Sequence, residues 1–183
     1  MPVDYASIRN LKFRIIFLPD RYRYTLQHLN NVRTRMVSGG ALAESYEGSK
    51  SMFAGMLAKE VALEIPDLEA ILVPPSSRND VQPYVAKILD LKPGLRNLSP
   101  RMTRSNGIKA ISANSLASII REFQYQPDGT ENSIKSLLIL DDIIGTGRTS
   151  LAMLYHLCKA GLSKNCQVTL AAPLWTTRPK AAT

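Results

Sequence analysis

The stretch LLILDDIIGTGRTS, Leu137–Ser150, decides how this chain folds and where a ligand would bind. Four aliphatic residues lead into Asp141 and Asp142, and a turn of glycine and threonine follows. The run Ile134–Leu140 is typical of a buried strand, and apolar spacing after the turn predicts a helix over Arg148–Ala160. Such a helix directs its first N–H groups and the positive end of its dipole at one point, which favours binding of a phosphate.

The carboxylates and the turn together suit one kind of ligand. Gly145 and Gly147 permit a close approach of the backbone, and the hydroxyls of Thr146 and Thr149 add donors. The two aspartates would repel a phosphate, but they can accept hydrogen bonds from sugar hydroxyls. A sugar 5-phosphate carries both groups and fits the pattern.

Three other interpretations compete. A nucleoside triphosphatase needs GxxxxGK[ST] upstream, and in the nearest candidate, EGSKS at Glu47–Ser51, Lys50 is displaced and no strand precedes it. A dinucleotide fold needs the third glycine of GxGxxG, which GTGRTS lacks. The last interpretation is a plain turn and helix cap without a ligand; the ordered pair of acids and pair of threonines argues against it.

The composition predicts one soluble domain. The chain has 183 residues, of which 45% are apolar and 21% charged, and we expect residues 1–183 to form a single domain, with residues 1–48 as a variable extension or part of a lid. No apolar run is long enough to span a bilayer and no secretory signal is visible, so we expect a cytoplasmic protein without a membrane partner. The two cysteines and two histidines have no zinc-ligand spacing, so a metal would be a hard ion bound through oxygen.

Strand and helix signals alternate along the chain. We expect strands over Leu11–Leu18, Ala70–Val73, Ile134–Leu140 and Cys166–Leu174, and helices over residues 21–37, about Ser49–Leu63, Val81–Leu91, Ser115–Phe123 and about Arg148–Ala160. This order predicts an α/β fold with a mostly parallel twisted sheet and helices on both faces. Such sheets bind ligands beyond the carboxyl ends of their strands, where the loops Pro74–Asp80 and Asp141–Gly147 begin.

The net charge of +8 suggests anionic partners. Between Leu91 and Arg121 there are six basic residues and no acid, and we expect most of Lys92–Asn114 to be a long loop. Long loops inside a compact domain are often functional lids. A merely solvated charged surface is the other interpretation of this segment.

The ordered motifs resemble a known family. LLILDDIIGTGRTS is similar to the phosphoribosyl pyrophosphate motif of type I phosphoribosyltransferases: four hydrophobic residues, two acids, two aliphatics, a small residue and Thr-Gly-x-Thr. ILVPPSSRND lies where that family has its pyrophosphate loop, and Lys92–Lys109 lies where it has a mobile basic hood. RMTRSN, Arg101–Asn106, resembles the Arg-x-Thr-x-Ser-Gln run of the competence-associated, amidophosphoribosyltransferase-like branch. The resemblance spans roughly Ser49–Leu174; Gly145 and the large Arg148 depart from the usual motif.

The resemblance implies roles for these residues. The aspartates would hold the ribose 2- and 3-hydroxyls, the following turn would wrap the 5-phosphate, and Arg101 and Arg104 would close over the donor as catalytic hood residues. The ribose 5-phosphate set is Asp141, Asp142, Ile144, Gly145, Thr146, Gly147, Arg148 and Thr149. The pyrophosphate set is Pro75, Ser76, Ser77 and Arg78.

The activity implied is transfer of ribose 5-phosphate from phosphoribosyl pyrophosphate to a nitrogenous base or amine, with release of pyrophosphate. Mg²⁺ would be the cofactor, with Asp141 or Asp142 as ligands directly or through water. Trp175 follows the last strand, where purine-using members stack an aromatic residue on the base. A tryptophan packed on the surface or at a subunit contact is the other interpretation, and the acceptor stays open.

A second hypothesis is a protein of the same fold that has lost transfer and senses nucleotides, or binds nucleic acid or a protein partner. Arg21–Arg35 interleaves Tyr22 and Tyr24 with basic residues, as nucleic-acid surfaces do, whereas the hood has no aromatic residue. Nucleic acid is therefore the less favoured partner. A homodimer and a subunit completed by another chain are both compatible with the sequence.

Overall fold

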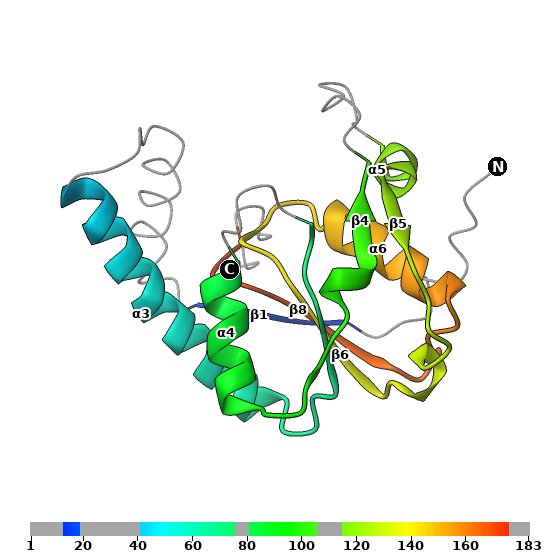
Figure 1. Cartoon of the computed structure of the whole chain (residues 1–183), viewed down its shortest axis with the longest axis horizontal. Helices are drawn as coiled ribbons and strands as arrows, with labels where there is room; N and C mark the ends of the chain where they lie inside the picture. Colours follow the sequence, from blue (N-terminus) through cyan, green and yellow to red (C-terminus); the bar gives the residue numbers. More distant parts are fainter. Residues whose placement is uncertain (1–12, 19–40, 76–80, 106–114, 176–183) are drawn as a thin grey trace, which may run out of the picture.

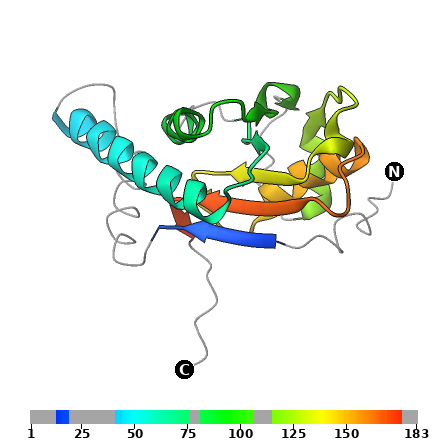
Figure 2. The ribbon, with the colours of Figure 1, turned by 90° about the horizontal axis from the view of Figure 1, so that it is seen from below.

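The computed structural model describes residues 13–18, 41–75, 81–105 and 115–175. Its centre is a five-stranded sheet in the order β1-β8-β6-β2-β3, and every pairing in it is parallel. The strands are β1 (Phe13–Phe17), β2 (Ala70–Leu72), β3 (Arg96–Asn97), β6 (Ser136–Leu140) and β8 (Gln167–Ala172). The arrows of β1, β8 and β6 point the same way in Figure 2. The predicted α/β class with a mostly parallel sheet is confirmed.

Helices cover both faces of this sheet (Figure 1). The helices are α3 (Ala41–Glu64), α4 (Gln82–Leu91), α5 (Leu116–Glu122) and α6 (Arg148–Lys159). Successive side chains of a strand point to opposite faces, so β6 serves two cores. Leu138 and Leu140 pack in the cluster with α3 and α4, and Leu137 and Ile139 pack in the cluster with α5 and α6. Among the described helices, none is long and apolar enough to cross a membrane.

Local sequence explains the start of α4 and both ends of α6. Pro83 lies in the first turn of α4, where its missing N–H costs no hydrogen bond. Helix α6 follows Gly147 at φ 71° and is succeeded by Gly161 at φ 102°, conformations that favour glycine. Helix α3 begins at Ala41, earlier than predicted. The helix predicted over residues 21–37 lies outside the described residues, while β1, inside residues 1–48, belongs to the main sheet.

The long loop predicted after Lys92 is wrong over its described part. The chain forms β3, a 3₁₀ turn at Ser99–Arg101 and β4 (Met102–Arg104), which pairs antiparallel with β5 (Phe123–Tyr125). Met102 and Phe123, both buried, anchor this antiparallel strand pair on the α5–α6 core. Strands of two or three residues are too short for a period-two pattern to be read in the sequence. Residues 106–114 lie outside the description.

Candidate functional site at the carboxyl edge of the sheet

Strands β2 and β6 are neighbours, and the chain leaves them in opposite directions. Ala70, Ile71 and Leu72 pair with Leu137, Leu138 and Ile139. After β2 the chain enters α4 on one face, and after β6 it enters α6 on the other. This pair is therefore a topological switch point, where α/β sheets place ligands beyond the strand ends. The two loops that the sequence singled out both start there.

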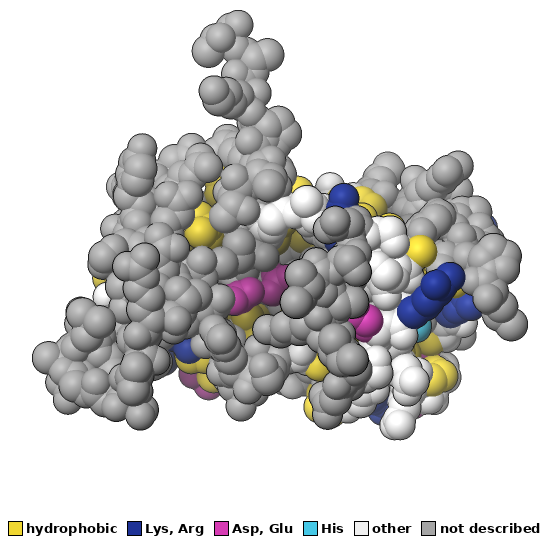
Figure 3. Space-filling view, turned by 90° about the horizontal axis from the view of Figure 1, so that it is seen from above, with side chains coloured by type: hydrophobic (Ala, Val, Ile, Leu, Met, Phe, Trp, Pro, Cys, Tyr) yellow, Lys and Arg dark blue, Asp and Glu magenta, His cyan; other side chains and the backbone are white. Residues whose placement is uncertain are grey.

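The segment after β6 is held at both ends. The backbone N–H of Asp141 donates to the Ala171 carbonyl at 2.9 Å, and the N–H of Asp142 donates to Asp141 Oδ1 at 2.9 Å. Ile144 is buried in the α5–α6 core, and the short strand β7 (Ile143–Ile144) pairs with β9 (Leu174–Trp175). The buried Ile144 and the β7–β9 pairing thus tie the loop down, and two half-buried carboxylates remain at the sheet edge. In the view from above, acidic side chains surface near the middle of the molecule (Figure 3).

Helix α6 begins directly after the glycine turn, and no side chain caps its N-terminus with a hydrogen bond. Gly147 is the N-cap residue in a left-handed conformation, and its carbonyl accepts from the Leu151 N–H at 3.0 Å. Thr146 and Arg148 are exposed, and Gly145 and Thr149 are half-buried. The first N–H groups of a helix have no partner within the helix, so this end suits an anion.

The loop after β2 begins beside the basic segment. The N–H of Val73 donates to Ser99 Oγ at 3.0 Å, and the Leu98 N–H donates to the Ile71 carbonyl at 2.8 Å. Pro75 is half-buried at the start of the loop, while Ser76, Ser77 and Arg78 lie outside the described residues. The 3₁₀ turn that carries Arg101 is therefore fixed next to the base of the predicted pyrophosphate loop.

Both predicted hood arginines have acidic partners. Arg101 forms an ion pair with Asp128, and Arg104 Nε donates to Glu122 Oε2 at 2.9 Å. The segment Lys92–Lys109 has no acid in sequence, but the β4–β5 pairing brings these two carboxylates beside it. Sequence reasoning missed both partners. The only signal was QPDGT, in which Asp-Gly-Thr marks a turn that starts with an aspartate.

A buried carboxylate holds that turn in place. Glu131, 1% exposed, accepts hydrogen bonds from the Tyr125 hydroxyl and from the N–H groups of Asp128 and Gly129, each at 3.0 Å. Burial and the hydrogen bond to Glu131 raise the pKa of the Tyr125 phenol. Asp128 Oδ1 accepts from the Thr130 N–H at 3.0 Å and its hydroxyl at 2.7 Å. The partner of Arg101 is thus positioned by a closed network.

Trp175 lies at the end of β9, and the structure describes its backbone. The backbone of Trp175 is the register partner of Ile144, which puts the chain after β8 beside the acidic loop; its side chain is outside the description.

Within the described ranges, no group of three or more His, Cys, Asp or Glu side chains is placed so that it could hold a metal ion. Two adjacent carboxylates suit Mg²⁺ that keeps waters and shares phosphate oxygens with a ligand, since this ion needs only one or two carboxylates from the protein.

Asp128 gives a pH test of this network. Hydrogen bonds from Thr130, with the Arg101 guanidinium nearby, lower the pKa of the Asp128 carboxyl from 3.8 to about 2. Its stabilising effect is complete above its unfolded pKa and is lost as the pH falls through about 2. In Asp128→Asn, we expect the thermal midpoint to lie below wild type near neutral pH and the difference to shrink as the pH falls toward 2. A difference that stays constant with pH would contradict this coupling.

A scan against protein-family models and a search of curated proteins found no match to the chain.

Proposed function

We propose that the protein is a Mg²⁺-dependent phosphoribosyltransferase, which transfers ribose 5-phosphate from phosphoribosyl pyrophosphate to a nitrogenous base or amine. The observation that carries the proposal is the adjacency of β2 and β6 at the switch point. It brings the start of the ILVPPSSRND loop and the Asp-Asp-Gly-Thr loop to one edge of the sheet. Phosphoribosyl pyrophosphate carries a phosphate at one end of its ribose and a pyrophosphate at the other. The two loops are suited to bind these two groups.

In this proposal each part of the edge has one task. The carboxylates of Asp141 and Asp142 accept from the ribose 2- and 3-hydroxyls, and the N–H groups and threonine hydroxyls of Gly145–Thr149 bind the 5-phosphate. The loop that begins at Pro75 binds the pyrophosphate. Arg101 and Arg104 contribute positive charge from the neighbouring segment, and Trp175 is the candidate for stacking on the base.

The main task of the protein in this reaction is to position the two substrates. The lone pair of the acceptor nitrogen forms a bond to the anomeric carbon, while the carbon–oxygen bond to pyrophosphate breaks and the leaving group takes its electron pair. The nitrogen then loses a proton. Charge builds on the leaving oxygens, so N–H donors and guanidinium groups aimed at them lower the barrier. Bound Mg²⁺ would neutralise part of the pyrophosphate charge. Exclusion of water protects the sugar from hydrolysis.

One observation favours a second function, a nucleotide-sensing protein of the same fold that no longer transfers. Both hood arginines are paired with carboxylates, so their charge is already partly neutralised. A sensor would keep the ribose 5-phosphate end of the site and need neither arginine. Binding without turnover would be its signature.

Removal of one carboxylate charge tests the site. In Asp142→Asn, we expect affinity for phosphoribosyl pyrophosphate with Mg²⁺ to fall by about tenfold or more, because a charge-assisted hydrogen bond to a ribose hydroxyl is weakened. Calorimetric titration measures the affinity, and pyrophosphate release with a panel of bases measures turnover. Asp90→Asn, on the exposed side of α4, is the matched control. Unchanged donor binding in Asp142→Asn would refute the assignment of the site.

The arginines should matter more for turnover than for binding. In the double variant Arg101→Ala and Arg104→Ala, we expect kcat to fall further than donor affinity, because the charge they offset develops in the transition state. Asp128→Asn, which removes the partner but keeps the Arg101 guanidinium, should retain turnover. If donor binding is lost and kcat is preserved, the arginines belong to a static pocket and the proposed role is wrong.

A further inference from the structure

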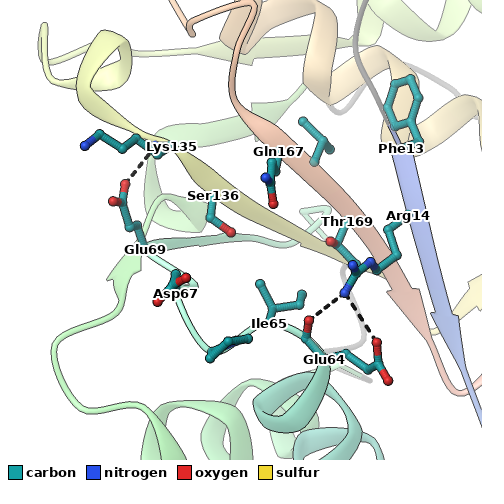
Figure 4. Close-up of a pocket in the computed structure, with 12 residues that line it drawn as sticks. Phe13, Arg14, Glu64, Ile65, Asp67, Glu69, Lys135, Ser136, Gln167 and Thr169 are labelled. Atoms are coloured by element: carbon teal, nitrogen blue, oxygen red, sulfur yellow. Dashed lines mark hydrogen bonds and ion pairs between the residues drawn. The ribbon is translucent and has the colours of Figure 1, made fainter.

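The opposite edge of the sheet carries a separate pocket. It has a volume of about 680 Å³ and is lined by the amino ends of β1, β6 and β8 and by the turn after α3 (Figure 4). Ligand sites in proteins commonly enclose about 300–1,000 Å³. Among the described residues, neither switch-point loop contributes to its lining, and the pocket lies at the opposite edge from the proposed donor site.

The sheet register explains why this pocket is polar. Arg14 pairs with Thr169, and Ser136 pairs with Gln167, so these side chains lie on one face of the sheet. Further along the same face, Leu138 packs against α3 and α4. Helix α3 ends at Glu64, and beyond that point the apolar row gives way to hydroxyls, an amide and a guanidinium. The side chains on this face of the sheet therefore change from apolar to polar at the point where α3 no longer covers them.

Two hydroxyl residues of this row are buried but unsatisfied within the described structure. Ser136 is 6% exposed and Thr169 is 5% exposed. Across the described residues, neither side-chain hydroxyl has a hydrogen-bond partner, and Figure 4 shows both among the residues that surround the pocket. Hydroxyls that line a pocket and have no internal partner can exchange hydrogen bonds with water or with a bound ligand. These two hydroxyls are therefore available to a ligand without the loss of a bond that holds the fold.

The charges around the pocket favour a cation. Arg14 is occupied, since its Nη1 donates to the Glu64 carbonyl at 2.5 Å and to Glu64 Oε2 at 3.3 Å. Lys135 also lines the pocket, and its side chain runs outward on the side of Glu69 in Figure 4. Glu69 Oε2 accepts from the Lys135 N–H at 2.8 Å, and Asp67 is an exposed carboxylate on the turn after α3. Three acids thus line the pocket of a chain whose net charge is +8.

We infer that this pocket binds a small ammonium compound that also carries hydroxyl groups, of about the size of an amino sugar. The ammonium lies toward Asp67 and Glu69, and the ligand hydroxyls exchange hydrogen bonds with Ser136 and Thr169. Because Glu64 is paired with Arg14, an anionic sugar of the same size is repelled mainly by Asp67 and Glu69, and a neutral sugar gains only the hydroxyl contacts.

The test uses glucosamine, glucose and gluconate as probes of equal size and different charge, with ligand-observed NMR on the full chain. We expect glucosamine to bind, glucose to bind about tenfold more weakly, and gluconate not to bind. Thr169→Val should weaken glucosamine binding about five- to tenfold, as loss of one hydrogen bond predicts. Asp67→Asn should weaken glucosamine but not glucose. Thr103→Val, an exposed threonine outside the pocket, is the matched control.

Protein stability supplies a second readout. Because the Thr169 hydroxyl has no internal partner, Thr169→Val should unfold at the same or a higher denaturant concentration than wild type. A lower midpoint would mean that the hydroxyl serves the fold, and would overturn the inference. Absence of binding by all probes, equal binding of gluconate, or unchanged binding to Thr169→Val would overturn it as well. Asp142→Asn should bind glucosamine like wild type, so failure here is distinguishable from failure of the proposed transferase site.

Discussion

The parallel pairing of β2 with β6 is the constraint on which the rest of the molecule depends. β6 is buried on both faces, so it requires helices on both. The chain meets that requirement by sending α4 to one face and α6 to the other, and the point where the two connections diverge becomes the site edge. A register slip of one residue would turn every β6 side chain to the opposite core and move the acidic pair away from the loop after β2.

The antiparallel pair of β4 and β5 holds the basic segment through ion pairs that are partly exposed to solvent. The Arg101 and Asp128 side chains are about one third exposed, at 35% and 32%. Ion pairs with this much solvent contact stabilise a protein only modestly. In the proposed function, a bound pyrophosphate would offer Arg101 several charge-assisted hydrogen bonds in place of one carboxylate. The buried Glu131 keeps the turn formed during such an exchange, because its three hydrogen bonds do not involve Arg101.

The sequence predicted the elements whose periodicity extends over many residues. These elements include the strand before Asp141 and the helix after Gly147, and the placement of helices on both faces was also predicted. Pairings between distant segments were not. The partners of Arg101 and Arg104 come from residues 18 or more positions away, through strands of three residues, and nothing local marks them. The polar side chains at the amino edge of the sheet could not be predicted either. Ser136 and Thr169 are ordinary residues for a strand, and only the register shows that they lie beside Gln167 and Arg14.

The proposed function requires that a sugar phosphate binds at the carboxyl edge between β2 and β6. Amide hydrogen exchange, followed by mass spectrometry with and without ribose 5-phosphate, tests it most directly, because it reports where backbone N–H groups become protected. We expect slower exchange in peptides that cover residues 141–149 and unchanged exchange at the amino edge, including residues 64–69. Protection confined to the amino edge, or none on residues 145–149 at a saturating ligand concentration, would contradict it.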